Sequence, residues 1–137
     1  MSNVVDHGPD AAIYFEGLSR GELLIQRCGN CHAAQFPPRG HCTKCGSRTM
    51  EWEVSDGVGT LYAKTVNRRA PEKEFEKLVP YAVGLVDLDL GVRVLARALC
   101  PPEQLATGMR TRVFADPDPV VQPGLVFVPL DGAEPAP

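Results

Sequence analysis

Short segments in which apolar and polar residues alternate follow one another through the second half of the chain. Residues 81–89 alternate in this way, and residues 92–99 do so again after a turn at 89–91. Alternation with a period of two is typical of a strand with one buried face, so we predict a β-hairpin here. Arg93 and Arg97 fall on the polar face of its second strand, which indicates a sheet that is buried on one side only.

Three further segments have the composition of short strands, and together with the hairpin they predict a mainly β structure of five strands. They lie at residues 60–67, 109–115 and 125–128, and one short helix is expected at 101–106, between the third and fourth strands. This order of elements fits the closed barrel of the OB-fold over residues 52–130, with an open sandwich as the alternative.

The N-terminal segment predicts a helix rather than a strand. Residues 10–21 can form a short helix that begins near Asp10, and its apolar residues share one face. These residues are Ile13, Tyr14, Phe15 and Leu18. Residues 1–9 and 131–137 have the composition of disordered ends. The polar connection at 68–80 is long for a compact chain, so we expect it to be either mobile or functional.

Two Cys-x-x-Cys pairs follow a predicted strand at residues 22–27. Each pair can bring two sulfur atoms together in a tight turn whose backbone N–H groups face them. Two such turns supply four thiolates to a tetrahedral Zn²⁺, and the ten residues between the pairs allow a short hairpin. We therefore predict a zinc ribbon over residues 22–51, with the ligands Cys28, Cys31, Cys42 and Cys45.

Disulfides, a redox-active pair and a mixed site with His32 or His41 are the alternatives for these cysteines. Disulfides suit a secreted chain, but no secretory leader is recognisable. The Pro- and Gly-rich surroundings do not offer the helix that follows a thioredoxin-like pair. Each histidine is adjacent to a cysteine ligand and cannot reach the metal without displacing it. Four thiolates fill the coordination sphere, so the zinc is expected to be structural rather than catalytic.

The 137 residues carry a net charge of −3 that is unevenly distributed. Residues 20–49 contain five basic side chains and one acidic one, whereas residues 50–137 contain 13 acidic and 9 basic ones. The basic ribbon either compensates the negative charge of the metal site or contacts phosphate. No apolar run is long enough to span a membrane, and we expect a cytoplasmic protein. The fifth cysteine, Cys100, is expected to be a buried, unreactive thiol.

No arrangement of residues in the sequence predicts catalysis. No histidine is well placed as a general base, and no serine has the context of a nucleophile. Asp87 and Asp89 flank the hairpin turn, where Asp is favoured for local hydrogen bonds. Two classes of function remain, a protein-binding accessory subunit and a single-stranded nucleic-acid-binding module. The acidic barrel with few aromatic residues disfavours the second, which needs a cationic groove with stacking platforms.

Several short motifs carry a resemblance to a known family. They are Tyr14-Phe15-Glu16-Gly17-Leu18 before the ribbon, Gln35-Phe36-Pro37-Pro38-Arg39 between the cysteine pairs, and Gly59-Thr60-Leu61-Tyr62, Pro80-Tyr81 and Val86-Asp87-Leu88 in the barrel. In these motifs the chain resembles the acyl-CoA-associated family that couples a rubredoxin-like zinc ribbon to a C-terminal OB-fold. One departure is His32, which stands where many relatives have glycine after the second cysteine.

The resemblance implies a non-catalytic accessory subunit that docks on a thiolase-superfamily enzyme, such as an acyltransferase or an aldolase that shortens steroid side chains as CoA thioesters. It implies structural Zn²⁺ on the same four cysteines. If the subunit contacts CoA, the basic residues that could meet its phosphates are Arg39, Lys64, Arg68 and Arg69, with a solvated surface as the alternative. A short apolar helix at a chain end needs a cover, so we expect a partner interface at Tyr14, Phe15 and Leu18.

Overall fold

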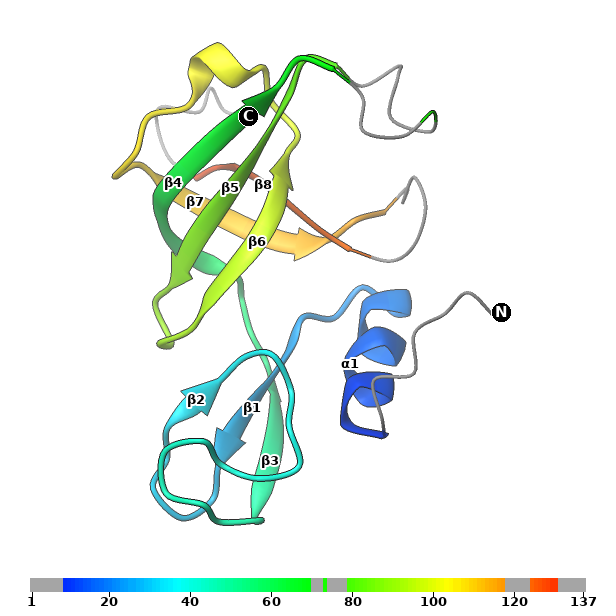
Figure 1. Cartoon of the computed structure of the whole chain (residues 1–137), viewed down its shortest axis with the longest axis vertical. Helices are drawn as coiled ribbons and strands as arrows, with labels where there is room; N and C mark the ends of the chain where they lie inside the picture. Colours follow the sequence, from blue (N-terminus) through cyan, green and yellow to red (C-terminus); the bar gives the residue numbers. More distant parts are fainter. Residues whose placement is uncertain (1–8, 70–72, 74–78, 118–123, 131–137) are drawn as a thin grey trace.

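The computed structural model describes residues 9–69, 73, 79–117 and 124–130. One helix and a small three-stranded sheet come first, and a barrel follows (Figure 1). The first part consists of α1 (Pro9–Ser19), β1 (Leu24–Cys28), β2 (Ala34–Gln35) and β3 (Met50–Val54). The barrel consists of β4 (Val58–Asn67), β5 (Tyr81–Leu88), β6 (Arg93–Ala98), the 3₁₀ helix η2 (Pro102–Gln104), β7 (Arg110–Ala115) and β8 (Leu125–Pro129).

The barrel closes in the strand order β4-β5-β6-β8-β7, and β7 returns to β4 through antiparallel pairs such as Gly59 with Thr111. Five strands with one short helix between the third and fourth are the arrangement predicted from the sequence, so the OB-fold prediction is confirmed and the open sandwich is wrong. The predicted helix at 101–106 is the single 3₁₀ turn η2.

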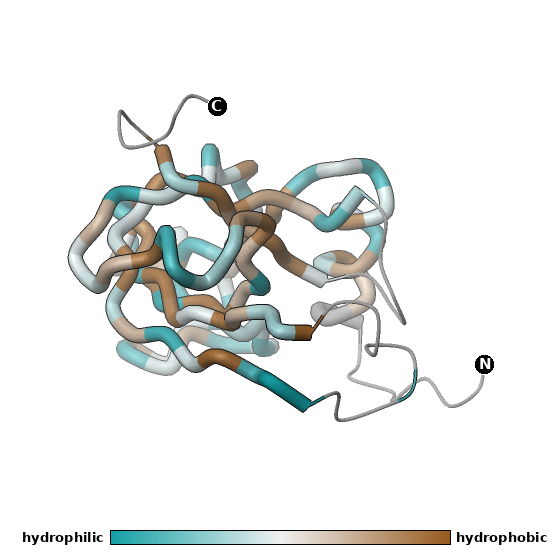
Figure 2. The backbone as a smooth tube through the Cα atoms, turned by 90° about the horizontal axis from the view of Figure 1, so that it is seen from above, coloured by the Kyte–Doolittle hydropathy of each residue, from teal (hydrophilic) through white to brown (hydrophobic). Residues whose placement is uncertain are grey.

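The barrel core is apolar and follows the alternation seen in the sequence. Hydrophobic and hydrophilic residues alternate along the tube in Figure 2. Leu61, Val86 and Phe127 lie at the centre and are 0% exposed. Gly57 starts the barrel with a φ of +77°, and an added Cβ would lie 1.8 Å from the carbonyl oxygen of Val113. Only glycine permits this close crossing of β4 and β7.

The same hydrophobic cluster continues out of the barrel into the N-terminal part. Tyr14 and Leu18 of α1 and Leu23 and Ile25 beside and within β1 belong to the cluster that contains the barrel interior. The backbone N–H of Ser55, just after β3, donates to the carbonyl of Leu23 at 2.8 Å. Figure 1 shows the sheet at the base of the barrel with α1 beside β1.

Several element boundaries differ from those expected. The helix begins at Pro9 and ends at Ser19, and the strand predicted at 22–27 is Leu24–Cys28. The short strands β2 and β3 were not predicted. The expected disordered ends, apart from Pro9, and most of the connection at 68–80 lie outside the described residues. None of the helices in the described part of the chain combines the length and apolar character needed to cross a membrane.

Candidate metal centre and its surroundings

The two cysteine pairs form two similar turns at the end of the ribbon. In the first, the backbone N–H groups of Asn30 and Cys31 both donate to the Sγ of Cys28, at 3.3 Å each. In the second, the Sγ of Cys42 accepts the corresponding bonds from residues two and three positions later, at 3.3 and 3.4 Å. Each turn therefore points backbone dipoles at one sulfur, as a metal-bound thiolate requires.

The four predicted ligands meet at one point, with all their sulfur atoms within 4.8 Å of one another. The Sγ atoms of Cys28 and Cys45 are 3.6 Å apart, and those of Cys31 and Cys42 are 3.7 Å apart. A tetrahedral zinc ion with Zn–S bonds of about 2.3 Å separates its sulfur ligands by about 3.8 Å. The site therefore fits a closed, structural Cys₄ zinc centre.

The thiols of Cys28, Cys31 and Cys42 differ in how readily they ionise without a metal. The backbone N–H bond from Cys31 lowers the pKa of Cys28 to about 6, and a matching bond lowers the pKa of Cys42. The N–H of Ala33 lowers the pKa of Cys31, but burial and bonds with the other thiols outweigh it and raise that pKa to about 11. Zinc supplies the charge that keeps all four as thiolates. Cys100 lies apart from this cluster and is half-buried rather than buried as predicted, and its partial burial raises its pKa.

His32 and His41 do not belong to the group of ligand atoms found among the described residues. His32 instead shapes the first turn, because its φ of +67° makes it the one non-glycine described residue in the left-handed region. Gly46 occupies the same place after the second turn, with a φ of +83°. The His32 N–H donates to the carbonyl of Cys28, and its own carbonyl accepts from Arg27. The departure at His32 therefore affects the turn and not the ligands.

Two buried glutamines, for which no role was predicted, hold the loop between the cysteine pairs. Gln26 is 1% exposed, and its side-chain amide pairs with both the N–H and the carbonyl of Arg39, at 2.8 Å each. Gln35 donates to the Gln26 side chain and to the carbonyl of His41, and it accepts from the N–H of Thr43. The glutamine side chains thus make the hydrogen bonds to the loop backbone that a neighbouring strand would otherwise make.

A signal for these glutamines was present in the sequence. Gln26 directly follows the apolar residues Leu23, Leu24 and Ile25, and the structure pairs it with Gln35 across β1 and β2. A buried polar residue in a strand calls for a partner, and the loop backbone is that partner. The consequence is a fixed backbone at Arg39, while the Arg39 side chain is exposed.

The predicted CoA-phosphate residues lie at two ends of the molecule. Arg39 belongs to the ribbon loop, whereas Arg68 and Arg69 follow β4, whose ten residues lead about 30 Å away from the ribbon (Figure 1). Lys64 donates through its Nζ to the carbonyl of Leu105 at 2.8 Å, over the barrel end. The structure therefore does not bring the four side chains together into one phosphate site.

The predicted partner interface on the helix is mostly covered by this chain itself. Tyr14 and Leu18 are 7% and 5% exposed, and the ring of Tyr14 packs edge-on against those of Phe15 and Phe36. Burial raises the pKa of Tyr14 to about 12. Little of Tyr14 or Leu18 is therefore left for a partner, because Phe36 of the loop packs on Tyr14 and Leu18 belongs to the shared hydrophobic cluster, whereas Phe15 is half-buried. Ile13, at 39%, is the exposed large hydrophobic residue of the described helix.

The two aspartates beside the β5–β6 turn form ion pairs rather than local turn bonds. Arg93 donates to Asp87 across the hairpin, and Arg110 of β7 donates to Asp89. These hydrogen bonds lower the pKa of both carboxyl groups. The turn explanation was wrong because each partner arginine comes from a different strand.

Together, these features define a protein class: a structural zinc ribbon joined to a closed OB barrel. Two family models match adjacent parts of the chain. The rubredoxin-like zinc ribbon domain of ChsH2 matches residues 15–51, and the C-terminal OB-fold domain of ChsH2 matches residues 52–115. The chain belongs to the ChsH2 family, as the sequence motifs predicted.

Relatives of two sizes resemble the chain. A DUF35 domain-containing scaffold protein of Methanocaldococcus jannaschii is 34% identical over 80% of this chain and 82% of its own length. A probable enoyl-CoA hydratase alpha subunit of Thermomonospora curvata is 32% identical over 85% of this chain but only 38% of its own. A solved structure, the Ltp2-ChsH2(DUF35) aldolase, is 30% identical with a TM-score of 0.78, covering 92% of this chain and 98% of that one.

Proposed function

We propose that this chain is a non-catalytic accessory subunit of an acyl-CoA-metabolising complex, which docks on a thiolase-superfamily enzyme in the cytoplasm and supports its activity. The observation that carries the proposal is the match to the Ltp2-ChsH2(DUF35) aldolase, where nearly the whole of the solved chain corresponds to this one. An equivalent chain in an aldolase assembly favours a carbon–carbon bond cleavage of a CoA thioester, with steroid side chains as one substrate class.

The hydratase relatives support the acyl-CoA part of the proposal. In the relative from Thermomonospora curvata the matching unit is about a third of a longer chain. A 3-oxo-4,17-pregnadiene-20-carboxyl-CoA hydratase alpha subunit of Mycobacterium tuberculosis matches in the same way, over 32% of its length. The ribbon and barrel therefore recur beside acyl-CoA enzymes, either fused or as a separate chain. A separate chain must bind its enzyme through a surface.

Arg39 is the strongest of the proposed contacts to CoA phosphates. Its guanidinium is exposed while its backbone is fixed on both sides by Gln26, which lowers the entropy lost when it binds an anion. The zinc turns on either side hold the same loop. Arg68 and Arg69 remain candidates at the far end of β4, where they would meet a different part of the complex.

Co-expression with a thiolase-superfamily protein from the same organism tests the proposal. We expect the two chains to co-purify, and we expect retro-aldol cleavage of a 3-hydroxyacyl-CoA to require both. Failure of every such protein to co-purify, or thioester turnover by the isolated chain, would contradict an accessory role. Salt-dependent binding of single-stranded DNA or RNA, with no complex, would favour the nucleic-acid alternative.

The CoA contact has its own test within that complex. Arg39→Ala should raise the KM for the CoA substrate about tenfold or more with little change in kcat, because a charge-assisted bond to phosphate is lost. Arg48→Ala removes the same charge from an exposed position in the ribbon and serves as the matched control. Equal KM values for the two variants would remove Arg39 from the CoA site.

A further inference from the structure

The outer face of β5 and β6 combines exposed apolar residues with charges that are already paired. In an OB-fold this face, formed by the second and third strands, is where ligands commonly bind. Antiparallel pairing places its outward residues in three rows, which are Val83 with Arg97, Leu85 with Leu95, and Asp87 with Arg93. We use the name β5–β6 outer face for these three rows together with the adjacent Tyr62 of β4.

The middle of the β5–β6 outer face is apolar and open to solvent. Leu95 is 61% exposed, the largest value among the exposed large hydrophobic residues of the described chain. Leu85 lies beside it in register, and Ala63 of β4 continues the row on the other side. Tyr62, next to this row at a β-bulge, is 55% exposed. Contiguous exposed apolar residues of this kind mark interaction surfaces, whereas single ones are ordinary.

The charged residues at the edges of this face are already paired with one another or with a neighbouring carboxylate. The guanidinium of Arg93 lies 3.7 Å from the centre of the Tyr62 ring and donates to Asp87 at 2.6 Å. Arg97 donates to Asp116 at 3.1 Å, with side chains only 16% and 9% exposed. Proteins that bind single-stranded nucleic acid need free cations along such a groove. The pairing instead gives a neutral rim around an apolar centre, which is the anatomy of a protein–protein interface.

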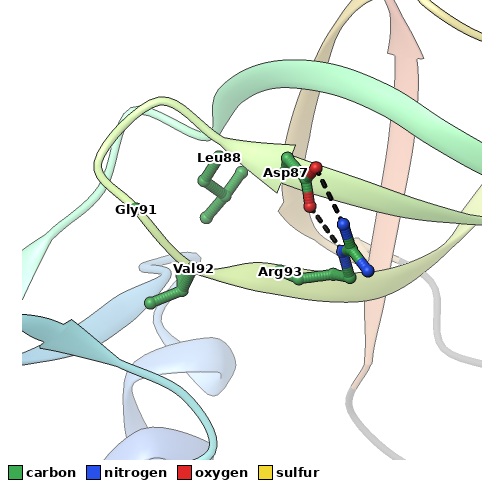
Figure 3. Close-up of a pocket in the computed structure, with 5 residues that line it drawn as sticks. All are labelled: Asp87, Leu88, Gly91, Val92 and Arg93. Atoms are coloured by element: carbon green, nitrogen blue, oxygen red, sulfur yellow. Dashed lines mark hydrogen bonds and ion pairs between the residues drawn. The ribbon is translucent and has the colours of Figure 1, made fainter. Parts of the chain in front are cut away.

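A hollow of about 420 Å³ adjoins the face at the hairpin end. Leu88, Gly91 and Val92 line it beside the Asp87–Arg93 ion pair, as Figure 3 shows. Arg93 thus belongs both to the hollow and to the stack on Tyr62. Hot spots of protein–protein interfaces are enriched in Tyr and Arg and cluster in well-packed pockets.

We infer that the β5–β6 outer face is the surface by which this chain docks on a second, different protein, whose contacting centre is apolar and which inserts one apolar side chain beside Arg93. The inference rests on the proposed function, so the occupant is the thiolase-superfamily subunit. Two observations favour it over another copy of this chain or a nucleic acid. The aldolase that this chain resembles carries Ltp2 in its name beside ChsH2(DUF35), and the arginines of the face are already neutralised.

The test compares two substitutions at equally exposed apolar positions. Leu95→Arg places an unpaired charge in the centre of the face, whereas Val54→Arg, at a residue 59% exposed at the end of β3, makes the same change outside it. Binding to the thiolase-superfamily protein that co-purifies with the wild-type chain is measured by calorimetry. We expect Leu95→Arg to weaken binding at least about thirtyfold, as expected for a hot spot, and Val54→Arg to leave it within about twofold. Thermal unfolding should show that both variants remain folded, because both side chains are exposed.

The outcomes separate this inference from the proposed function. A wild-type complex that Leu95→Arg leaves intact would overturn the assignment of this face while the accessory role stands, and equal losses with both variants would overturn it too. Tyr62→Ser, which removes the stacked ring under Arg93 without adding charge, should weaken the complex in the same direction. Self-association abolished by Leu95→Arg, or loss of single-stranded RNA binding in that variant, would show a different occupant.

Discussion

The ribbon and the barrel are both small β-structures, but their interiors are made of different chemistry. The barrel interior is apolar, with Leu61, Val86 and Phe127 completely buried. The far end of the ribbon instead buries two sulfur atoms, of Cys28 and Cys42, and the amides of two glutamines. The barrel is therefore stabilised by removing apolar surface from water, whereas the ribbon depends on a metal and on hydrogen bonds that must all be made.

Strand β1 shows how the two regions are joined. Ile25, near its start, packs in the hydrophobic cluster shared with the barrel, whereas Gln26 and Cys28 further along serve the loop and the metal. The first part of this strand therefore packs in the apolar core, and its last residues contact the loop and the metal site. We therefore expect that the metal end can be disrupted while the barrel keeps its own core.

Removal of zinc is expected to have the largest effect and to make the ribbon and the barrel unfold in two separate transitions. Structural zinc stabilises zinc-finger peptides by about 10–16 kcal/mol, far more than the apolar contacts of so short a ribbon. Chelation or Cys42→Ser should therefore unfold residues 28–50. Trp52, the single tryptophan of the chain, reports this change by fluorescence. Amide hydrogen exchange should show lost protection from Cys28 to Met50 and retained protection in β5 and β6.

The matched control for Cys42→Ser is Cys100→Ser, because Cys100 lies outside the sulfur cluster. It should bind one equivalent of zinc and leave the Trp52 signal unchanged. If β5 and β6 lose protection together with the ribbon, the two regions form one cooperative unit, which would contradict the expectation that they unfold separately.

Gln26→Ala should have an intermediate effect that is confined to the ribbon. The substitution leaves the N–H and carbonyl of Arg39 and the amide of Gln35 without their buried partner. Each buried polar group left unsatisfied costs about 1–3 kcal/mol, so we expect a total loss of a few kcal/mol in urea unfolding followed by Trp52 fluorescence. Gln104→Ala, at an exposed position in η2, is the control and should change stability by less than about 0.5 kcal/mol.

The smallest effects are expected from substitutions at the residues that follow the two cysteine turns of the ribbon. His32 and Gly46 have the same left-handed backbone, which costs a residue with a side chain about 1–2 kcal/mol. Gly46→Ala should therefore destabilise the zinc-loaded ribbon by about 1 kcal/mol, since no neighbouring atom lies within 4 Å of the added Cβ and only the backbone opposes it. His32→Gly should stabilise it by several tenths of a kcal/mol, because the greater freedom of glycine in the unfolded chain offsets part of the gain. The urea midpoint measures both, and a loss of stability in His32→Gly would indicate that the imidazole has a structural role.

Much of the fold could be predicted because its signals are local. The alternation at 81–99 is decided by neighbouring residues, and the ligand set follows from two short cysteine motifs. The strand β2 was missed because it has only two residues, whereas the alternation of apolar and acidic residues in β3 was an overlooked signal. The cover of Tyr14 was not predicted because Phe36, which packs on it, lies some twenty residues away in sequence.

The zinc ligands, the five barrel strands and the family could all be predicted from the sequence, since each depends on spacing or periodicity within a short segment. Which charges are paired and which apolar residues remain exposed became known from the three-dimensional arrangement of the strands. Asp89 pairs with Arg110, and Arg97 pairs with Asp116, in contacts between segments distant in sequence. No described residue of this chain covers Leu95, which is 61% exposed. The physical reason is that burial and charge pairing depend on which strands become neighbours when the barrel closes, and local periodicity does not specify the partner of an outward-facing side chain.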